Sequence, residues 1–201
     1  MPHGKTLISV VIPVKNGAET LDACLYGIAS QKVGADIEVI VIDSGSTDNS
    51  LDIIRKYPKP KIISIDPASF NHGLTRNLGV AHANGDFVVM TVQDAVPADE
   101  HWLAKMLRHF DDPNVAGVCG QQVVPHHKDK NPHLWFRPMS QPSIRKVHFN
   151  TQEEYDLLLS EEKKQACSWD DVNSMYRREA LLKMPFREAF LQKMPCGRRM
   201  H

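Results

Sequence analysis

Through the first half of the chain, short runs of β-branched and apolar residues alternate with segments that carry apolar residues at helical spacing. The apolar runs cover residues 7–13, 37–42, 61–65 and 87–92. Between them, the sequence predicts helices over 18–31, around 51–54 with a stop at Pro58, and over 71–84. Such alternation is typical of consecutive βαβ units. The sequence therefore predicts an α/β fold with a mostly parallel, Rossmann-like sheet and helices on both faces.

The second half of the chain changes in character. The sequence predicts a helix over 99–110, a strand over 115–124, a charged helix over 152–164, a return strand over 171–177 and a short helix over 178–184. Between 125 and 148, proline, histidine and basic residues occur with no regular period. So long a stretch without a period is typical of a lid or a binding loop. We expect a single domain over 1–201, made of two halves (7–98 and 99–190) and a tail (191–201) of different composition.

Composition excludes several classes of protein. Lys and Arg total 24 and Asp and Glu total 24, so the formal net charge is zero, which argues against a dedicated nucleic-acid-binding protein. The four cysteines include no Cys-x-x-Cys pair, so we expect neither a disulfide framework nor a zinc knuckle. No apolar run approaches the roughly 20 residues that a membrane-spanning helix needs. We therefore expect a cytoplasmic globular protein, and peripheral docking at the inner face of the membrane stays open.

Polar residues gather directly after three of the predicted strands, in segments 14–17, 43–48 and 93–97. In a parallel sheet the carboxyl ends of the strands meet at one edge, and ligands bind there. Asp43 closes a buried strand, and its carboxylate can accept hydrogen bonds from a ribose or a base. Asp48 is better explained as a negative charge stabilised by the first turn of the following helix.

Two further side chains suit an anionic ligand. Asp94 follows the fourth apolar run, and one carboxylate together with substrate phosphates is enough to bind Mg²⁺. Residues 71–77 open a helix whose N-terminus favours anions, and Arg76 adds a cation suited to phosphate. The alternative for Arg76 is a plain surface charge, and the alternative for Asp94 is a turn residue before the next helix.

Four segments, in their order and spacing, together resemble glycosyltransferase family 2. They are Ile8–Asn16, Val41–Ser50, Asn71–Asn77, and Gln93–Pro97 with Trp102 and Leu103. The resemblance implies the GT-A fold, a nucleotide diphosphate sugar as donor, and transfer with inversion to a glycan or a lipid-linked acceptor. Residues 70–77 are most similar to the rhamnosyltransferase-like bacterial branch, which builds surface polysaccharide.

The resemblance also implies roles for individual residues. The nucleotide would be held in the first half, by Pro13, Val14, Lys15, Asn16, Asp43 and Arg76. The acceptor side would be shaped by the second half, through 125–148, Trp169, Asp171 and Asn173. Asp94 matches the second aspartate of the family's Asp-x-Asp motif, which binds Mg²⁺ or Mn²⁺. Val92 stands in place of the first aspartate, so one carboxylate is left for the metal.

The tail departs from the family pattern. Family members carry a Glu-Asp-x-Leu-Trp segment with the expected catalytic base, whereas residues 190–201 are basic and contain no carboxylate. Suppose that residues 191–196 are encoded by TTG, CAG, AAG, ATG, CCC and TGT, which assumes only synonymous choices. The reading frame that starts one base earlier then encodes Ala-Glu-Asp-Ala-Leu-Trp. We therefore expect that a frameshift replaced this segment, which slows transfer and leaves apolar surface that favours self-association. The alternative is a natural tail with a different base, for which Asp171 is the best candidate.

Two other functions fit parts of the pattern. A nucleotidyltransferase would also bind a nucleotide and Mg²⁺. It normally has a glycine-rich, basic loop after the first strand, where this chain has one glycine and one lysine in residues 14–18. The second alternative is a non-catalytic module that recognises nucleotide sugars or glycans. Nucleotide binding without turnover would distinguish that module from an enzyme.

Overall fold

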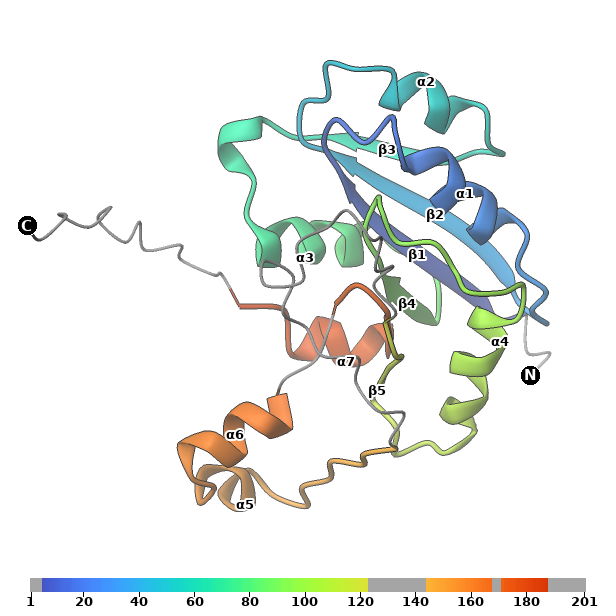
Figure 1. The fold of residues 1–201 in the computed structure, drawn as a ribbon. Helices are drawn as coiled ribbons and strands as arrows, with labels where there is room; N and C mark the ends of the chain where they lie inside the picture. Colours follow the sequence, from blue (N-terminus) through green and yellow to red (C-terminus); the bar gives the residue numbers. More distant parts are fainter. Residues whose placement is uncertain (1–4, 123–143, 168–170, 188–201) are drawn as a thin grey trace, which may run out of the picture.

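The computed structural model describes residues 5–122, 144–167 and 171–187, and within them a six-stranded sheet forms the centre (Figure 1). The strands are β1 Leu7–Val14, β2 Asp36–Asp43, β3 Lys61–Ser64, β4 Phe87–Met90, β5 Gly117–Cys119 and β6 Ser174–Arg177. Their order across the sheet is β3-β2-β1-β4-β6-β5. The first four strands are parallel, and β6 is antiparallel to both β4 and β5. The predicted mostly parallel sheet is confirmed.

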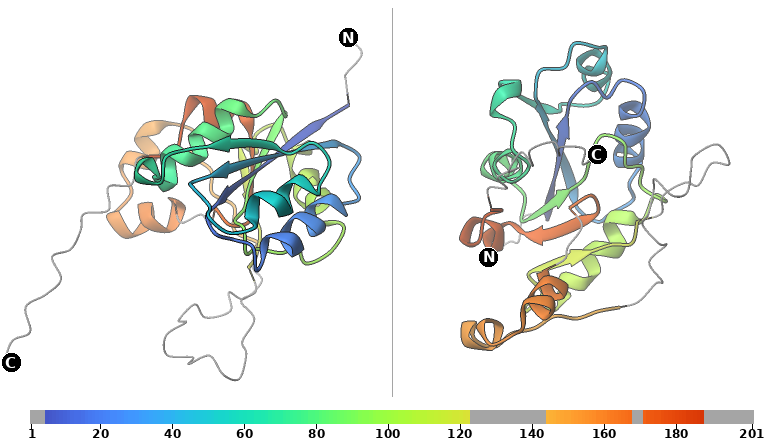
Figure 2. Two further views of the ribbon diagram at one scale, coloured as in Figure 1. Left: turned by 90° about the horizontal axis from the view of Figure 1, so that it is seen from above. Right: turned by 60° about the vertical axis from the view of Figure 1, so that its left-hand side comes forward.

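Helices cover both faces of this sheet (Figure 2). They are α1 Leu21–Ala29, α2 Ser50–Arg55, α3 His72–His82, α4 Trp102–Leu107, α5 Gln152–Asp156, α6 Ser160–Cys167 and α7 Arg178–Lys183, with short 3₁₀ helices at Pro67–Ser69 and Arg108–Asp111. The last two helices before β6, α5 and α6, lie away from the sheet. Across the described residues, no helix combines the length and the apolar character that crossing a membrane requires.

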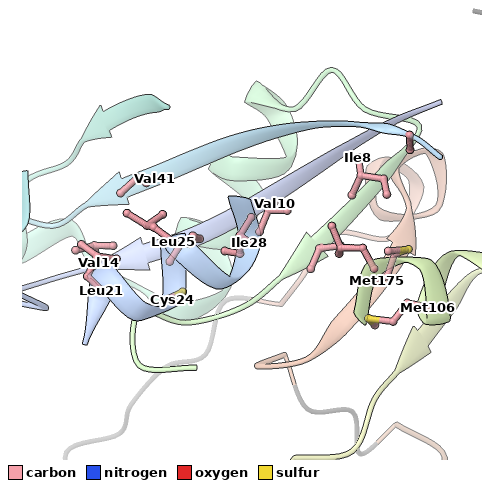
Figure 3. Close-up of a cluster of buried hydrophobic side chains, with 14 of the residues drawn as sticks. Ile8, Val10, Val14, Leu21, Cys24, Leu25, Ile28, Val41, Met106 and Met175 are labelled. Atoms are coloured by element: carbon pink, nitrogen blue, oxygen red, sulfur yellow. The ribbon is translucent and has the colours of Figure 1, made fainter. Parts of the chain in front are cut away.

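The sheet separates two apolar cores, and β1 contributes to both. Its side chains alternate with the period of two that a strand imposes, so Val10 and Ile12 pack toward α1, α2 and α4, and Val11 packs toward α3 and α7. Figure 3 shows the predicted apolar face of α1, between Leu21 and Ile28, directed at β1. Each fully buried aliphatic side chain of this kind contributes about 1.5–3 kcal/mol to folding.

The prediction of one continuous charged helix over 152–164 is wrong. The chain forms α5 and α6 instead, with a break at Leu157–Leu159. The carboxylate of Glu162 accepts a hydrogen bond from the backbone N–H of Leu159 at 2.8 Å. A glutamate in the first turn that reaches back in this way starts a new helix. This local start signal therefore divides a segment whose charged pattern looked uniform.

Of the strand predicted over 115–124, the structure describes residues 115–122, and within these the strand is limited to Gly117–Cys119, so the described part is shorter than predicted. Beyond it, the side chain of Asn173 donates a hydrogen bond to the carbonyl of Gln121 at 2.9 Å. A side chain therefore takes the place of regular strand pairing. Similarly, the helix predicted over 99–110 begins at Trp102 and finishes as a 3₁₀ turn.

At the amino edge of the sheet, polar side chains close a network around a buried serine. Ser9 in β1 is fully buried, donates to the Glu38 carboxylate and accepts from the backbone N–H of Gly85 at 2.8 Å. Glu38 also accepts from the backbone N–H of Asn84 at 2.6 Å and from its side chain at 3.1 Å. These bonds tie β1 and β2 to the turn that leads into β4.

Candidate functional site

Three loops meet at the carboxyl edge of the sheet, as the strand pattern predicts. They follow β1, β2 and β4, which lie side by side and run in the same direction. Pro13 lies in β1 and pairs with Ile42 in β2. The carbonyl of Val14 then accepts hydrogen bonds from the Ser44 backbone N–H at 2.9 Å and from its hydroxyl at 3.2 Å. The first two loops are therefore joined from their first residues onward.

Asn16 fastens the first loop to the second. Its backbone has φ of 49°, in the left-handed region that asparagine tolerates better than most residues. In this conformation its N–H donates to the Ser46 hydroxyl at 2.9 Å, and its side-chain oxygen accepts from the Thr47 N–H at 2.8 Å. Asn16, which the family resemblance assigned to the nucleotide, therefore shapes the loop backbone.

Asp48 has a role beyond the predicted one at the start of the following helix. It lies before α2 rather than in its first turn, and its carboxylate accepts from the Ala18 N–H at 3.0 Å and from both the N–H and the hydroxyl of Ser50. The Ser50 hydroxyl also accepts from the Gly17 N–H at 2.8 Å. The bond from the Ser50 hydroxyl is the main cause that lowers the pKa of Asp48. This aspartate links two loops, and the helix dipole alone does not explain it.

Gln93 ties the loop after β4 to the loop after β1, and sequence reasoning missed it. Its side-chain amide pairs with both backbone groups of Lys15: it accepts from the N–H at 2.8 Å and donates to the carbonyl at 3.2 Å. The Gln93 carbonyl accepts from the Thr20 hydroxyl at 3.2 Å. A Cβ atom at Gly17 would lie 2.7 Å from the Gln93 side-chain oxygen, so a larger residue there would displace this amide from Lys15. The Lys15 backbone is therefore fixed, while its side chain is exposed.

Asp43 lies under the second loop, with only 3% of its surface exposed. Its carboxylate accepts from the backbone N–H groups of Gly45 at 3.2 Å and Ser46 at 3.1 Å. Gly45 has φ of +83° and lies so close to Pro67 that a Cβ atom would be 2.5 Å from the proline ring. The segment that leads to α3 therefore packs against this loop. Binding of a ribose or a base by Asp43 stays a prediction.

Asp94 is exposed in the turn after β4, where a hydrogen bond of 3.1 Å joins the Ala95 N–H to the Val92 carbonyl. Below it, burial raises the pKa of Cys24 to about 12, and the charge of Asp94 adds to the shift. The described residues contain no group of three or more His, Cys, Asp or Glu side chains that could hold a metal. A single carboxylate fits a divalent cation only where substrate phosphates supply further oxygens.

Arg76 is not a plain surface charge, because its side chain is largely buried and has partners on two sides. Its side chain is 12% exposed, its Nη1 donates to the His72 carbonyl at 3.0 Å, and its Nε lies 3.9 Å from a carboxylate oxygen of Asp171. The N-terminus of α3 is already capped, because the Asn71 side chain accepts from the N–H groups of Gly73 and Leu74. The cap occupies two N–H groups of this helix end, so an anion here would be bound mainly by Arg76, and that role stays a prediction.

The predicted acceptor-side residues separate into two places. Asp171 lies beside Arg76 and accepts a hydrogen bond of 2.9 Å from the Tyr176 hydroxyl. Asn173 instead accepts from the Trp102 indole N–H at 2.7 Å and from the Gly120 N–H at 2.8 Å through its carbonyl, which fastens α4 and β5 to β6. Trp169 lies outside the described residues.

The tail and most of the long irregular segment also lie outside the described residues, at 188–201 and 123–143. The frameshift therefore stays a prediction, which sequencing of the coding DNA would test.

A second residue that sequence reasoning missed is Asn77, next to Arg76. Its side chain donates to the Phe186 carbonyl at 2.8 Å and accepts from the Phe186 N–H at 2.9 Å, which joins α3 to the second half.

Comparison with known proteins adds independent evidence. The model of "Glycosyl transferase family 2" matches residues 9–184. The O-antigen chain rhamnosyltransferase WbaN of Salmonella anatum is 48% identical over 125 residues, and RfbN of Salmonella typhimurium, strain LT2, which has the same description, is 38% identical over 126 residues. Each match covers 62% of this chain and 39% of the relative, so the chain spans well under half of their length.

A solved structure shares the fold. Glucosyl-3-phosphoglycerate synthase from Mycobacterium tuberculosis, in complex with Mn²⁺, UDP and glucosyl-3-phosphoglycerate, superposes with a TM-score of 0.63 at 20% sequence identity. The match covers 92% of this chain and 61% of that one. The family model matches most of the chain, and the sheet and its loops superpose on a solved structure. The chain therefore belongs to glycosyl transferase family 2 and has the GT-A fold.

Proposed function

We propose that the chain is the nucleotide-sugar-binding part of an inverting glycosyltransferase that acts in surface polysaccharide synthesis. The donor is a nucleotide diphosphate sugar, and the acceptor is a glycan or a lipid-linked glycan. The observation that carries the proposal is the fastening of three loops at one sheet edge by Asn16, Asp48 and Gln93. Rhamnosyltransferases of O-antigen chains among the relatives support the choice of product and donor class.

In this proposal the first half, 7–98, binds the nucleotide. The rigid backbone of 13–16 and the Asp43 carboxylate hold the base and the ribose. Arg76 would bind the diphosphate. The packing of the segment that leads to its helix against the Asp43 loop supports this placement. A loop backbone that is already ordered binds a ligand with a smaller entropic cost.

A divalent cation would be held by Asp94 together with the two phosphates of the donor. When bound, Mg²⁺ or Mn²⁺ would stabilise the negative charge that builds on the leaving diphosphate. The solved relative with Mn²⁺ and UDP supports a divalent cation. With Val92 in place of a second carboxylate, we expect metal binding that depends on the nucleotide.

Transfer would break the bond between the sugar C1 and the phosphate oxygen, with the electron pair leaving on the diphosphate. The acceptor hydroxyl oxygen would form the new bond to C1 from the opposite face and lose its proton to a base. Asp171 is poorly placed to be this base, because Tyr176 and Arg76 already engage its carboxylate. We place the reaction in the cytoplasm, at the inner face of the membrane where the acceptor is lipid-linked.

Titration calorimetry tests the donor site. UDP, dTDP and GDP would be titrated into the chain with and without Mn²⁺, and donor turnover would be followed with the corresponding nucleotide sugars. We expect one nucleoside diphosphate to bind, and to bind more tightly with metal. No binding of any of the three would overturn the proposal. Binding without turnover, both in this chain and in a version that carries Ala-Glu-Asp-Ala-Leu-Trp in place of 191–196, would instead favour a non-catalytic module. Synthesis of a nucleotide sugar from a nucleoside triphosphate would favour a nucleotidyltransferase.

A further inference from the structure

Side chains from both halves of the chain meet beside the donor edge of the sheet. Arg76 comes from α3, whereas Asp171 and Tyr176 come from the return strand β6 and the residues before it. Ser174 at the start of β6 pairs with Met90 at the carboxyl end of β4, which places this part of the second half at the same edge as Asp94. Asp171 precedes β6 on this side of the sheet, whereas Tyr176 pairs with Val88 further along β6 and reaches Asp171 through its hydroxyl.

The Arg76 guanidinium is held on two sides. Nη1 donates to the His72 carbonyl at 3.0 Å, and the buried Nε has no hydrogen-bond acceptor among the described residues. The Asp171 carboxylate lies 3.9 Å from this Nε. A buried cation is costly unless a charge of opposite sign lies near it. Asp171 therefore compensates Arg76 without taking up all of its donors.

Asp171 is itself held by Tyr176, whose hydroxyl donates to the other carboxylate oxygen at 2.9 Å. Burial raises the pKa of Tyr176, and the neighbouring Asp171 charge raises it further, so the phenol stays protonated and continues to donate. The Tyr176 ring is fixed in turn by an edge-on contact with Phe186, with ring centroids 5.9 Å apart.

Attachment of α3 to the second half does not depend on this ion pair. Asn77 binds the backbone of Phe186 through two hydrogen bonds. Gly73 lies so close to the Arg187 carbonyl that a side chain there would overlap it. The ion pair therefore has a task other than docking the two halves.

We propose that Asp171 and Tyr176 are positioning residues that orient the Arg76 guanidinium toward the diphosphate of the nucleotide donor. The proposal rests on the function proposed above. Arginine presents its donors in a rigid planar fork, so fixing the Nε side also fixes the direction of the remaining N–H groups. Tyr176 orients Asp171, Asp171 orients Arg76, and Arg76 meets the phosphates.

Removing the Asp171 charge distinguishes two roles for this residue: orienting the Arg76 guanidinium, or only neutralising its positive charge. If Asp171 only neutralised Arg76, Asp171→Asn would raise the positive potential and strengthen the binding of an anion. If Asp171 positions Arg76, the same change weakens binding, because the guanidinium is no longer held in one direction. The two roles therefore predict opposite signs for one measurement.

The experiment is calorimetric titration of Asp171→Asn and Tyr176→Phe with the nucleoside diphosphate that the parent chain binds, and with the corresponding nucleoside. We expect diphosphate binding to weaken about tenfold in each variant, which corresponds to loss of one hydrogen bond between Arg76 and a charged phosphate. Nucleoside binding should be unchanged. In an Arg76→Lys background, Asp171→Asn should have no further effect. Asn77→Ala is the matched control: it removes a contact between the same elements, so it should lower the melting temperature and leave diphosphate affinity unchanged.

Unchanged or tighter diphosphate binding by Asp171→Asn would overturn the positioning role while leaving the proposed function intact. Equal weakening of diphosphate and nucleoside binding would also overturn it, since general loosening of the fold has that effect. If the parent binds no nucleoside diphosphate, the proposed function fails and the positioning role fails with it. Should Asp171→Asn not fold, Tyr176→Phe, which removes only the hydroxyl, decides the question by the same criteria.

Discussion

The two edges of the same sheet use polar residues in different ways. At the amino edge, Ser9, Glu38 and Asn84 bond to one another and to the backbone of one turn. At the carboxyl edge, Asn16 and Gln93 bond to the backbones of neighbouring loops. The first arrangement closes a structure around a buried hydroxyl, whereas the second joins three neighbouring loops to one another. We therefore assign the amino-edge network to folding, and the joined loops of the carboxyl edge, with Asp43 buried beneath them and Asp94 exposed beside them, to the proposed donor site.

This comparison predicts that changes at the amino edge alter folding and leave ligand binding unaffected. Gly85→Ala should have the largest effect, because a Cβ atom would lie 2.6 Å from the Ser9 hydroxyl and 2.7 Å from the Leu7 carbonyl. We expect a loss of about 2–3 kcal/mol in the free energy of unfolding, measured with urea. Gly34→Ala is the control, because a Cβ there meets no atom within 4 Å. Equal stability of the two variants would show that the amino edge is not tightly closed.

A change at the carboxyl edge should affect binding more than folding, and Asp43→Ala tests this most strongly. The variant loses a carboxylate that would accept from the ligand, so nucleoside diphosphate affinity should fall by at least about tenfold, which titration calorimetry measures. Some stability is lost as well, because the N–H groups of Gly45 and Ser46 lose their acceptor. A folded variant that binds as tightly as the parent would contradict the assignment of Asp43 to the donor site.

Asp94→Asn sharpens the comparison, since this exposed residue should matter for metal alone. We expect Mn²⁺ to stop enhancing the binding of nucleoside diphosphate, and the free energy of unfolding to change by less than about 0.5 kcal/mol. Asp99→Asn is the matched control, an exposed carboxylate in the same segment that pairs with Lys105. If both variants keep the Mn²⁺ enhancement of the parent, Asp94 does not hold the metal.

The fold could be predicted because its information is local. The run Leu7–Val14 is apolar and β-branched enough to indicate a buried strand, and the rule for parallel sheets then brings the loops at Asp43 and Asp94 together. Where a local signal was overlooked, as at Glu162, the predicted element was wrong. The loop positions were therefore predictable from segments of about ten residues each.

The bonds within the site could not be predicted, because their partners are distant in the sequence. Gln93 and Lys15 are 78 positions apart, and Asn77 and Phe186 are 109 apart. Nothing in the residues around Gln93 distinguishes an amide that binds backbone from one that faces solvent. The same holds for Arg76, which local sequence could only describe as a cation near a helix start. Its partner Asp171 is distant in the sequence, and only the structure shows that the two lie side by side; a place for Asp171 at the acceptor side stays a prediction.

The smallest predicted effect is a pH dependence that originates at the amino edge. Partial burial pushes the pKa of Glu38 up, but hydrogen bonds from Ser9 and Asn84 outweigh it and hold this pKa below its ordinary value of 4.5. A lowered folded-state pKa means that Glu38 stabilises the fold above pH 4.5, and that this contribution is lost as the pH falls through the folded-state value.

Urea unfolding of the parent and of Glu38→Gln at pH 7 and pH 3 measures this contribution. Other carboxylates titrate equally in both proteins, so the difference between them isolates Glu38. The parent should lose more stability on acidification than the variant, by less than about 1 kcal/mol, because the Glu38 side chain is only partly buried and solvent screens its interactions. Since the loops of the carboxyl edge share no bond with Glu38, nucleoside diphosphate affinity at pH 7 should be the same in both. A loss of affinity in Glu38→Gln would mean that the two edges are coupled through β2, and that their separation into folding and binding roles is wrong.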